Sequence, residues 1–188
     1  MSLPEAPYRL AIADSPLIRP AQLEDAEAMA EIRADREADV APLMDPTYTA
    51  ESEAQWREHG PAGRRAFVEA ALSRPNQYFA YTAVIGEKVV GYASAEAPLE
   101  SEYTYWRGMN IARDYDGHGI GRLLEAERRT WALRVGRPIR ARIVVGNNRS
   151  MDFFQRQGFV QVDIQESTPK QLLRFNVMEL GLAALNGV

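Results

Sequence analysis

The sequence predicts an α/β protein built on a mixed β-sheet of about seven strands flanked by four to five helices. Three observations support this fold class. The length of 188 residues suits one domain. Strand-like and helix-like segments interleave along the chain in the order β-α-α-β-β-β-α-β-α-β-β. Apolar residues make up 46% of the sequence, which is enough for a core. We expect one domain over residues 17–182, an N-terminal extension at 1–16 and a tail at 183–188.

The individual elements follow from local composition and from apolar spacing. Strands are expected where β-branched and aromatic residues gather, at 17–20, 78–85, 89–95, 103–112, 139–145, 159–164 and 172–180. Helices are expected at 24–38, 51–72, 119–135 and 150–157. Residues 41–50 contain two prolines and predict a loop. Gly60 and Pro61 are expected to break the second helix into two pieces.

Composition excludes several function classes. Without cysteine, disulfides, thiolate metal sites and a cysteine nucleophile are ruled out. His59 and His118 are far apart in sequence and offer little to a metal site or a Ser-His-Asp triad, so no metal is expected. The net charge of −4 argues against nucleic-acid binding. The sequence has no apolar run of the roughly 18 residues that a membrane span needs. Residues 1–7 do not resemble a signal peptide, so a cytoplasmic location is expected.

The most informative segment is a glycine-rich turn between an expected strand and a long amphipathic helix. Three alternating glycines, Gly117, Gly119 and Gly121, open this helix. Its expected apolar face consists of Ile120, Leu123, Leu124, Trp131 and Val135. Free N–H groups and the helix dipole make such a turn a favourable site for a pyrophosphate.

Other interpretations of the turn fit less well. A dinucleotide-binding G-x-G-x-x-G pattern would need glycine where Arg122 stands. A P-loop would need Lys-Ser or Lys-Thr after its last glycine, and neither follows. A connection that binds nothing remains an alternative, although three glycines in five residues destabilise a helix start. A nucleotide-binding regulator also stays open as a function.

Two motifs in order resemble the GNAT superfamily of N-acetyltransferases. The family signature Q/R-x-x-G-x-G/A matches at Gly119 and Gly121, with Asp116 in the place of Gln or Arg. Residues 147–159 are similar to the family segment N-x-x-[SA]-x-x-x-Y-x-x-x-G-F, with Phe154 in the Tyr place. The resemblance spans about residues 17–180 and implies a GNAT-like fold. It also implies acetyl-CoA as co-substrate and transfer of its acetyl group to a primary amine by direct attack in a ternary complex.

The resemblance also implies which residues hold acetyl-CoA. The glycine turn would bind the pyrophosphate, and backbone groups of the preceding strand would line the pantetheine arm and bind the oxyanion. The residues implied in binding are Met109, Ile111, Ala112, Asp116, Gly117, His118, Gly119, Ile120, Gly121, Arg122, Asn147, Ser150 and Phe154. Asp116 replaces a phosphate-facing donor, so weakened CoA affinity is expected. For Asn147, a turn residue that ends a strand is nearly as good an interpretation.

The catalytic groups depart most from the family pattern. Glu102 lies one position from the usual place of the family's base and is the favoured candidate. Phe154 cannot donate a proton, so either Tyr103 or Tyr105 acts as the acid, or the thiol of pKa ~8.5 leaves as thiolate. A catalytically silent acyl-CoA-binding module is the alternative function.

The acceptor is expected to be a small-molecule or peptide amine, with no nucleic acid or membrane as partner. Acidic residues in the variable regions favour a cationic acceptor; they are Asp39, Asp45, Glu51, Glu53, Glu96, Glu100 and Glu102. Members of the family are often dimers, so the resemblance leaves a homodimer open.

Overall fold

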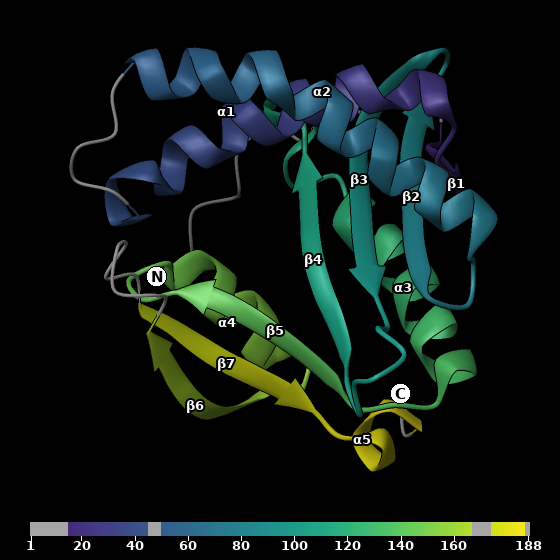
Figure 1. The fold of residues 1–188 in the computed structure, drawn as a ribbon, viewed down its shortest axis with the longest axis vertical. Coiled ribbons are helices and arrows are strands. Elements are labelled where there is room, and N and C mark those ends of the chain that lie inside the picture. Colours follow the sequence, from purple (N-terminus) through teal and green to yellow (C-terminus); the bar gives the residue numbers. More distant parts are fainter. Residues whose placement is uncertain (1–14, 45–49, 167–173, 187–188) are drawn as a thin grey trace, which may run out of the picture.

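The protein forms one seven-stranded mixed sheet in the order β1-β2-β3-β4-β5-β7-β6 (Figure 1). This computed structural model describes residues 15–44, 50–166 and 174–186, and leaves out the side chains of residues 42, 44 and 50–57. The strands are β1 (Leu17–Pro20), β2 (Tyr78–Ile85), β3 (Lys88–Glu96), β4 (Thr104–Ile111), β5 (Ile139–Val144), β6 (Val160–Glu166) and β7 (Arg174–Leu180). The α-helices in the described part are α1 (Ala26–Met44), α2 (Ala50–Ser73), α3 (Ile120–Val135), α4 (Asn148–Arg156) and α5 (Leu182–Asn186). The α/β fold expected from the sequence is confirmed.

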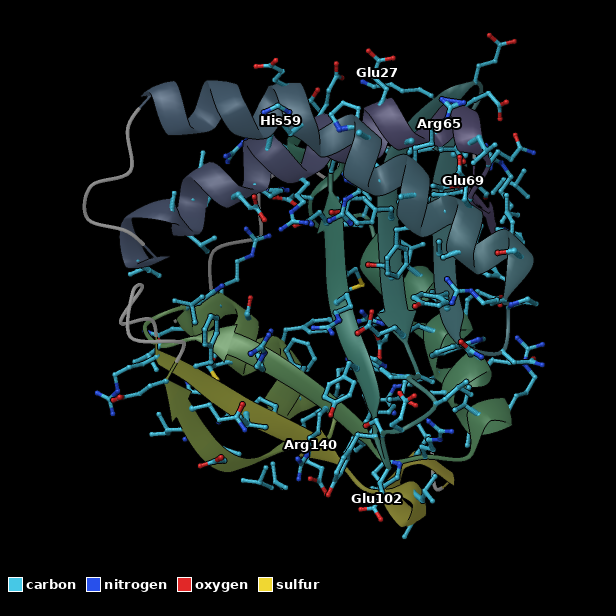
Figure 2. The ribbon with its side chains drawn as sticks, viewed as in Figure 1. Glu27, His59, Arg65, Glu69, Glu102 and Arg140 are labelled. Atoms are coloured by element: carbon cyan, nitrogen blue, oxygen red, sulfur yellow. The ribbon has the colours of Figure 1, made fainter. Side chains whose placement is uncertain are left out.

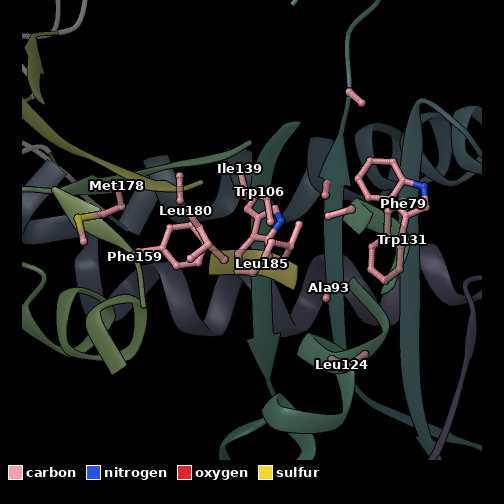
Figure 3. Close-up of a cluster of buried hydrophobic side chains, with 14 of the residues drawn as sticks. Phe79, Ala93, Trp106, Leu124, Trp131, Ile139, Phe159, Met178, Leu180 and Leu185 are labelled. Carbon is pink, nitrogen blue, oxygen red and sulfur yellow. The ribbon is translucent and has the colours of Figure 1, made fainter. Parts of the chain in front are cut away.

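The helices cover the sheet on both faces. On one face, α1 and α2 pack over β2, β3 and β4, around a cluster that includes Met29, Val68 and Tyr92. On the other face, α3 packs against β2, β3 and β4. A larger cluster there runs from Phe79 and Trp131 to Phe159 and includes Trp106 of β4 (Figure 3). Within the ranges given above, no helix is both long and apolar enough to cross a membrane.

Two expectations for the N-terminal half are wrong. The loop expected at 41–50 does not begin at residue 41, because α1 continues to Met44; residues 45–49 lie outside the described part. The expected break at Pro61 is absent, since α2 runs unbroken from Ala50 to Ser73. Packing on α1 stabilises α2 here: a Cβ placed on Gly60 would lie 3.4 Å from the Ala30 methyl group. Tertiary contact thus outweighs the local preference of a proline to end a helix.

Two smaller differences concern α3 and the C-terminus. Leu123, expected on the apolar face of α3, is 44% exposed. Residues 183–186, expected as part of the tail, belong to α5 (Leu182–Asn186), and Leu185 is buried in the larger core cluster. The short apolar helix α5 therefore packs against the core through Leu185.

Candidate functional site

The central feature of the site is a split between two parallel strands. β4 and β5 pair at only three positions, Thr104↔Ile139, Tyr105↔Arg140 and Trp106↔Ala141. Beyond them the strands diverge, as Figure 1 shows. On the other side of β4, the register with β3 shifts between Ser94 and Ala95, so that Arg107 is the extra residue of a β-bulge. The bulge turns the rest of β4 away from β5 and leaves its edge unpaired.

The unpaired edge of β4 presents backbone groups to the split. The Ala112 N–H donates to the Val90 carbonyl at 2.9 Å, so the backbone groups of Ala112 face β3. In an antiparallel pair every second residue faces the partner strand, so the backbone groups of Gly108, four positions earlier, also face β3. Those of Met109 and Ile111 face the opposite way, into the split. The structure therefore leaves Met109 and Ile111 as candidate binding groups, whereas the Ala112 N–H is used within the sheet.

The glycine turn lies directly after β4 and opens α3. Gly117 and Gly119 have φ of 79° and 81°, a left-handed conformation that favours glycine, and Gly119 is the N-cap of α3. A Cβ at either position would meet no atom within 4 Å, so open space borders the turn. A Cβ on Gly121, by contrast, would lie 3.7 Å from the terminal methyl of Met109. Gly121 therefore contributes close packing, and the other two glycines shape the turn.

The remaining residues expected in this turn differ in exposure. Ile120 is buried in the core, His118 is half-buried and the Arg122 side chain is exposed. Only the backbone of Ile120 can therefore contact a ligand, while Arg122 is free to move toward one.

Asp116 joins three parts of the site. Its carboxylate accepts hydrogen bonds from Arg36 of α1 and, at 3.4 Å, from Arg149 of α4. Arg36 also donates through Nε to the Ile111 carbonyl at the end of β4, at 2.7 Å. Burial by itself would raise the pKa of Asp116, but the Arg36 hydrogen bond and the charges of Arg36 and Arg149 outweigh it and lower the pKa. The acid at this signature position is thus a charged anchor between two guanidinium groups.

The second motif builds the start of α4. The Asn147 side chain accepts a hydrogen bond from the Ser150 N–H at 3.1 Å and caps the helix. The Phe154 ring packs between aromatic rings, with its centre 5.9 Å from that of Trp106 and 4.9 Å from that of Phe159. These contacts attach α4 to the core beside the split.

The three predicted catalytic residues gather at the closed end of the split. Glu102 is exposed just before β4, at the opposite end of this strand from the glycine turn (Figure 2). The guanidinium of Arg140 lies 3.5 Å from the centre of the Tyr103 ring. The Tyr105 hydroxyl accepts a hydrogen bond from Ser101 at 3.2 Å. Thus the implied binding residues lie at one end of β4 and the predicted catalytic residues at the other.

The structure adds polar residues that the sequence reasoning missed. On the α1–α2 face, buried Tyr92 accepts a 2.8 Å hydrogen bond from Asn110, and burial raises the pKa of Tyr92 to about 12. On the α3 face, Arg128 is buried beneath β4. A signal for Arg128 existed, because it lies four positions after Leu124 on the apolar stripe of α3. Tyr92 lies in the strand expected at 89–95, but the sequence did not indicate its hydrogen bond with Asn110.

The sequence pattern of the acetyltransferase (GNAT) family matches residues 38–159, which include the split strands and the glycine turn. This match places the protein in the acyltransferase class. The chain therefore belongs to the GNAT acetyltransferase family, as the two motifs had indicated. No curated protein sequence matches the chain. Among the described residues, no group of His, Asp or Glu side chains is arranged to hold a metal ion.

Solved structures share the fold at low sequence identity. The PaiA N-acetyltransferase of Thermoplasma acidophilum, in complex with coenzyme A, has a TM-score of 0.68 and 18% identity; the match covers 89% of this chain and 99% of that one. YncA of Salmonella typhimurium, with acetyl-CoA, has a TM-score of 0.67, 21% identity and coverage of 90% and 95%. A ribosomal-protein-alanine N-acetyltransferase of Brucella melitensis has a TM-score of 0.66, 23% identity and coverage of 88% and 99%. These likenesses confirm the GNAT-like architecture.

Proposed function

We propose that this protein transfers the acetyl group of acetyl-CoA to a primary amine of a small molecule or peptide, by direct attack in a ternary complex. The observation that carries the proposal is the split, which ends the β4–β5 pairing after Trp106 and exposes the edge of β4. Family membership supports the reaction type. The coenzyme A and acetyl-CoA bound to PaiA and YncA support the choice of co-substrate.

The residues around the split fit the chemical parts of acetyl-CoA. The N–H groups of the turn at Gly117–Gly119, with the positive end of α3, suit the pyrophosphate. The open space beside these glycines lets a phosphate approach the backbone. The outward-facing backbone groups of Met109 and the N–H of Ile111 suit the amide-containing arm, which carries donors and acceptors of its own, whereas the Ile111 carbonyl already accepts from Arg36. Asn147 fits a capping role better than direct contact, because its side-chain oxygen already accepts from Ser150.

The reaction requires a neutral amine and stabilisation of negative charge on the acyl oxygen. Bound acetyl-CoA supplies an acyl group activated as a thioester. As the amine nitrogen forms its bond to the acyl carbon, the carbon–sulfur bond breaks and the amine loses a proton. Glu102 is the proposed acceptor of that proton through a chain of water molecules, because seven positions along an extended chain separate it from Met109. The Met109 N–H, which points into the split, is the proposed donor to the acyl oxygen.

Protonation of the leaving thiolate has two proposed routes. Tyr103 or Tyr105 could supply a proton, since both lie at the closed end of the split. Alternatively the thiolate leaves unprotonated, because a thiol of pKa about 8.5 is a fair leaving group near neutral pH. Phe154 takes no part in proton transfer and serves as a packing residue.

A cationic acceptor is proposed from the acidic residues near the variable regions. Two of these, Asp39 and Glu96, already pair with Arg113 and Arg107. Glu100 and Glu102 are exposed and remain available to attract an amine. Asp45 and the side chains of Glu51 and Glu53 lie outside the described part. The homodimer stays a prediction.

The test is thiol release from acetyl-CoA against a panel of amines, preceded by calorimetric titration with CoA. The panel contains spermidine, an aminoglycoside and a peptide with N-terminal alanine. We expect CoA binding and amine-dependent thiol release with at least one acceptor. Binding without turnover across the panel would favour the silent acyl-CoA-binding module, and binding of ATP or NAD in preference to CoA would favour a nucleotide-binding regulator.

A further inference from the structure

A buried ionic cluster lies on α3 directly beneath β4. Arg128 is 1% exposed, Glu125 3% and Arg129 9%. Glu125 accepts two hydrogen bonds from Arg128 on one carboxylate oxygen, at 2.7 and 3.2 Å, and one from Arg129 on the other oxygen, at 3.1 Å. Two guanidinium groups thus share one carboxylate, and the cluster carries one net positive charge. Removal of charged groups from water is costly, so an uncompensated charge at this place calls for an explanation.

Arg128 contacts β4 where the strand leaves β5. Its Nη1 reaches the Gly108 carbonyl at 3.5 Å, and the Ser94 hydroxyl reaches the same oxygen at 3.5 Å. The guanidinium lies 3.8 Å from the centre of the Trp106 ring, which holds it in place. Burial lowers the pKa of Arg128, and Glu125 partly offsets this effect. A guanidinium stays charged in proteins, so the positive charge faces Gly108 permanently.

The Gly108 carbonyl and the Met109 N–H belong to one peptide group. No cis peptide bond occurs in the described chain, so the two bonds point in opposite directions. The carbonyl faces β3 and Arg128, and the N–H faces the split. A donor that draws electron density to the carbonyl oxygen makes the N–H of the same peptide more acidic, which strengthens the hydrogen bond it donates.

We propose that Arg128 is a positioning residue that orients and polarises the Gly108–Met109 peptide, so that the Met109 N–H binds the acyl oxygen of acetyl-CoA more strongly. This inference rests on the proposed acetyl transfer. The effect grows as negative charge develops on the acyl oxygen, and it therefore favours the transition state over bound acetyl-CoA.

The test compares two variants that remove the same charge from the cluster. Arg128→Met leaves a neutral Glu125–Arg129 pair and removes the contact with Gly108. Arg129→Met leaves a neutral Glu125–Arg128 pair and keeps that contact, so it is the matched control. The first readout is the infrared carbonyl stretch of acetyl-CoA labelled with ¹³C at the acyl carbon, bound without acceptor. A stronger hydrogen bond lowers this frequency.

We expect the bound carbonyl stretch to lie below that of free acetyl-CoA in the wild type and in Arg129→Met, and to move back toward the free value in Arg128→Met. With the best amine of the panel, kcat of Arg128→Met should fall roughly ten-fold while KM for acetyl-CoA changes less than about two-fold. Arg128→Lys, which keeps the charge, should recover part of both effects. Ser94→Ala removes the other side-chain donor to the Gly108 carbonyl and should raise the frequency to a smaller extent. This variant keeps the test available if Arg128→Met does not fold.

Two results would overturn the inference. One is a bound carbonyl stretch in Arg128→Met that equals that of the wild type. If Arg128→Met does not fold, the corresponding result is a wild-type carbonyl stretch in both Ser94→Ala and Arg128→Lys. The other is an equal shift in Arg128→Met and Arg129→Met, which would assign the effect to the charge of the cluster and not to the contact with Gly108. If the wild type fails to bind acetyl-CoA in calorimetry, the proposed function itself has failed, and this outcome is separate from both.

Discussion

Asp116 has an unusual setting for an acid beside the glycine turn that is proposed to bind phosphate. Arg36 and Arg149 both donate to its carboxylate, so the group of three carries one net positive charge. The Arg149 side chain is 76% exposed, and the Arg36 side chain is only 10% exposed. Arg36 therefore fixes the acid in place, while Arg149 remains free to turn toward an incoming phosphate. We therefore expect these two partners to offset the weakening of CoA affinity that Asp116 alone predicts.

Arg149→Ala should weaken CoA binding by roughly three- to ten-fold, because it leaves the Asp116 charge less well compensated beside the pyrophosphate. Titration calorimetry with CoA measures the change. At about 0.5 M salt the difference from wild type should shrink, since exposed charges are screened. Arg156→Ala, at the exposed far end of the same helix, is the control and should bind as the wild type does. A loss of affinity that is independent of salt would argue against this electrostatic role.

Phe154 is a packing residue among aromatic rings, and its replacement by tyrosine tests whether an acid is needed. Phe154→Tyr should keep activity, because the ring and its packing against Trp106 are retained. The measurement is kcat and kcat/KM for thiol release with the best amine. Complete loss of activity, with CoA affinity intact, would mean that the reaction requires an unsubstituted phenyl ring at position 154.

Residue contacts set the limit of what the sequence could predict. Gly119 and Gly121 stood out because glycines at a helix start are costly unless they serve a purpose. Arg36 could not be found in this way, because it lies 80 positions from Asp116 and only the fold brings them together. The charge of Arg128 on an apolar stripe was visible in the sequence, but its contact with the Gly108 carbonyl was not.

The helix most important for the proposed CoA site is α3, which has a glycine in the left-handed conformation at each end. Gly119 at the N-cap has φ of 81° and Gly136 at the C-cap has φ of 70°. A Cβ would meet no atom within 4 Å at either position. Both positions thus require a left-handed backbone conformation, and only Gly119 borders the split.

Gly119→Ala and Gly136→Ala should therefore each lower the free energy of unfolding by about 1 kcal/mol, from left-handed strain. Only Gly119→Ala should also weaken CoA binding, by roughly ten-fold or more, because its methyl group would project where a phosphate approaches the N–H groups. Thermal unfolding and calorimetric titration measure the two effects. Equal CoA affinity in both variants would show that the glycine turn is not part of the CoA-binding site.

At the level of elements, the sequence predicted the strands and the glycine turn well. Apolar alternation and β-branched residues mark strands such as β2 and β3 locally. The unbroken course of α2 could not be predicted, because close packing of Gly60 on Ala30 overrides the proline. Likewise the split depends on the bulge at Arg107, which is a property of two strands together.

The whole molecule is held at its N-terminal edge by a buried ion pair. Asp25 accepts two hydrogen bonds from Arg19 of β1, at 2.7 and 2.9 Å, and a third from the Gln22 N–H at 2.8 Å. It also accepts one from Thr82 of β2 at 3.2 Å. Burial tends to raise the pKa of Asp25, but these hydrogen bonds and the charge of Arg19 lower it overall. The carboxylate thus joins β1, β2 and the start of α1.

Asp25→Asn should lower the free energy of unfolding at neutral pH by roughly 2–3 kcal/mol, because it removes a charge-assisted network. A lowered folded-state pKa stabilises the protein above the unfolded pKa of about 3.9, and this stabilisation is lost as the pH falls through the folded value. Denaturant unfolding between about pH 7 and pH 3 should therefore show the variant and wild type converging below about pH 4. Asp152→Asn, an exposed change on α4, serves as the control. A difference that stays constant over this pH range would contradict the assignment.

Acetyl-CoA is proposed to bind in the β4–β5 split, with its pyrophosphate on the glycine turn. A crystal structure of the complex with CoA would show whether it does. We predict the pyrophosphate at the N–H groups of Gly117–Gly119, the arm along the edge of β4 at Met109 and Ile111, and the sulfur toward the closed end. CoA bound elsewhere on the molecule, or a split filled by side chains with no CoA bound, would contradict the account.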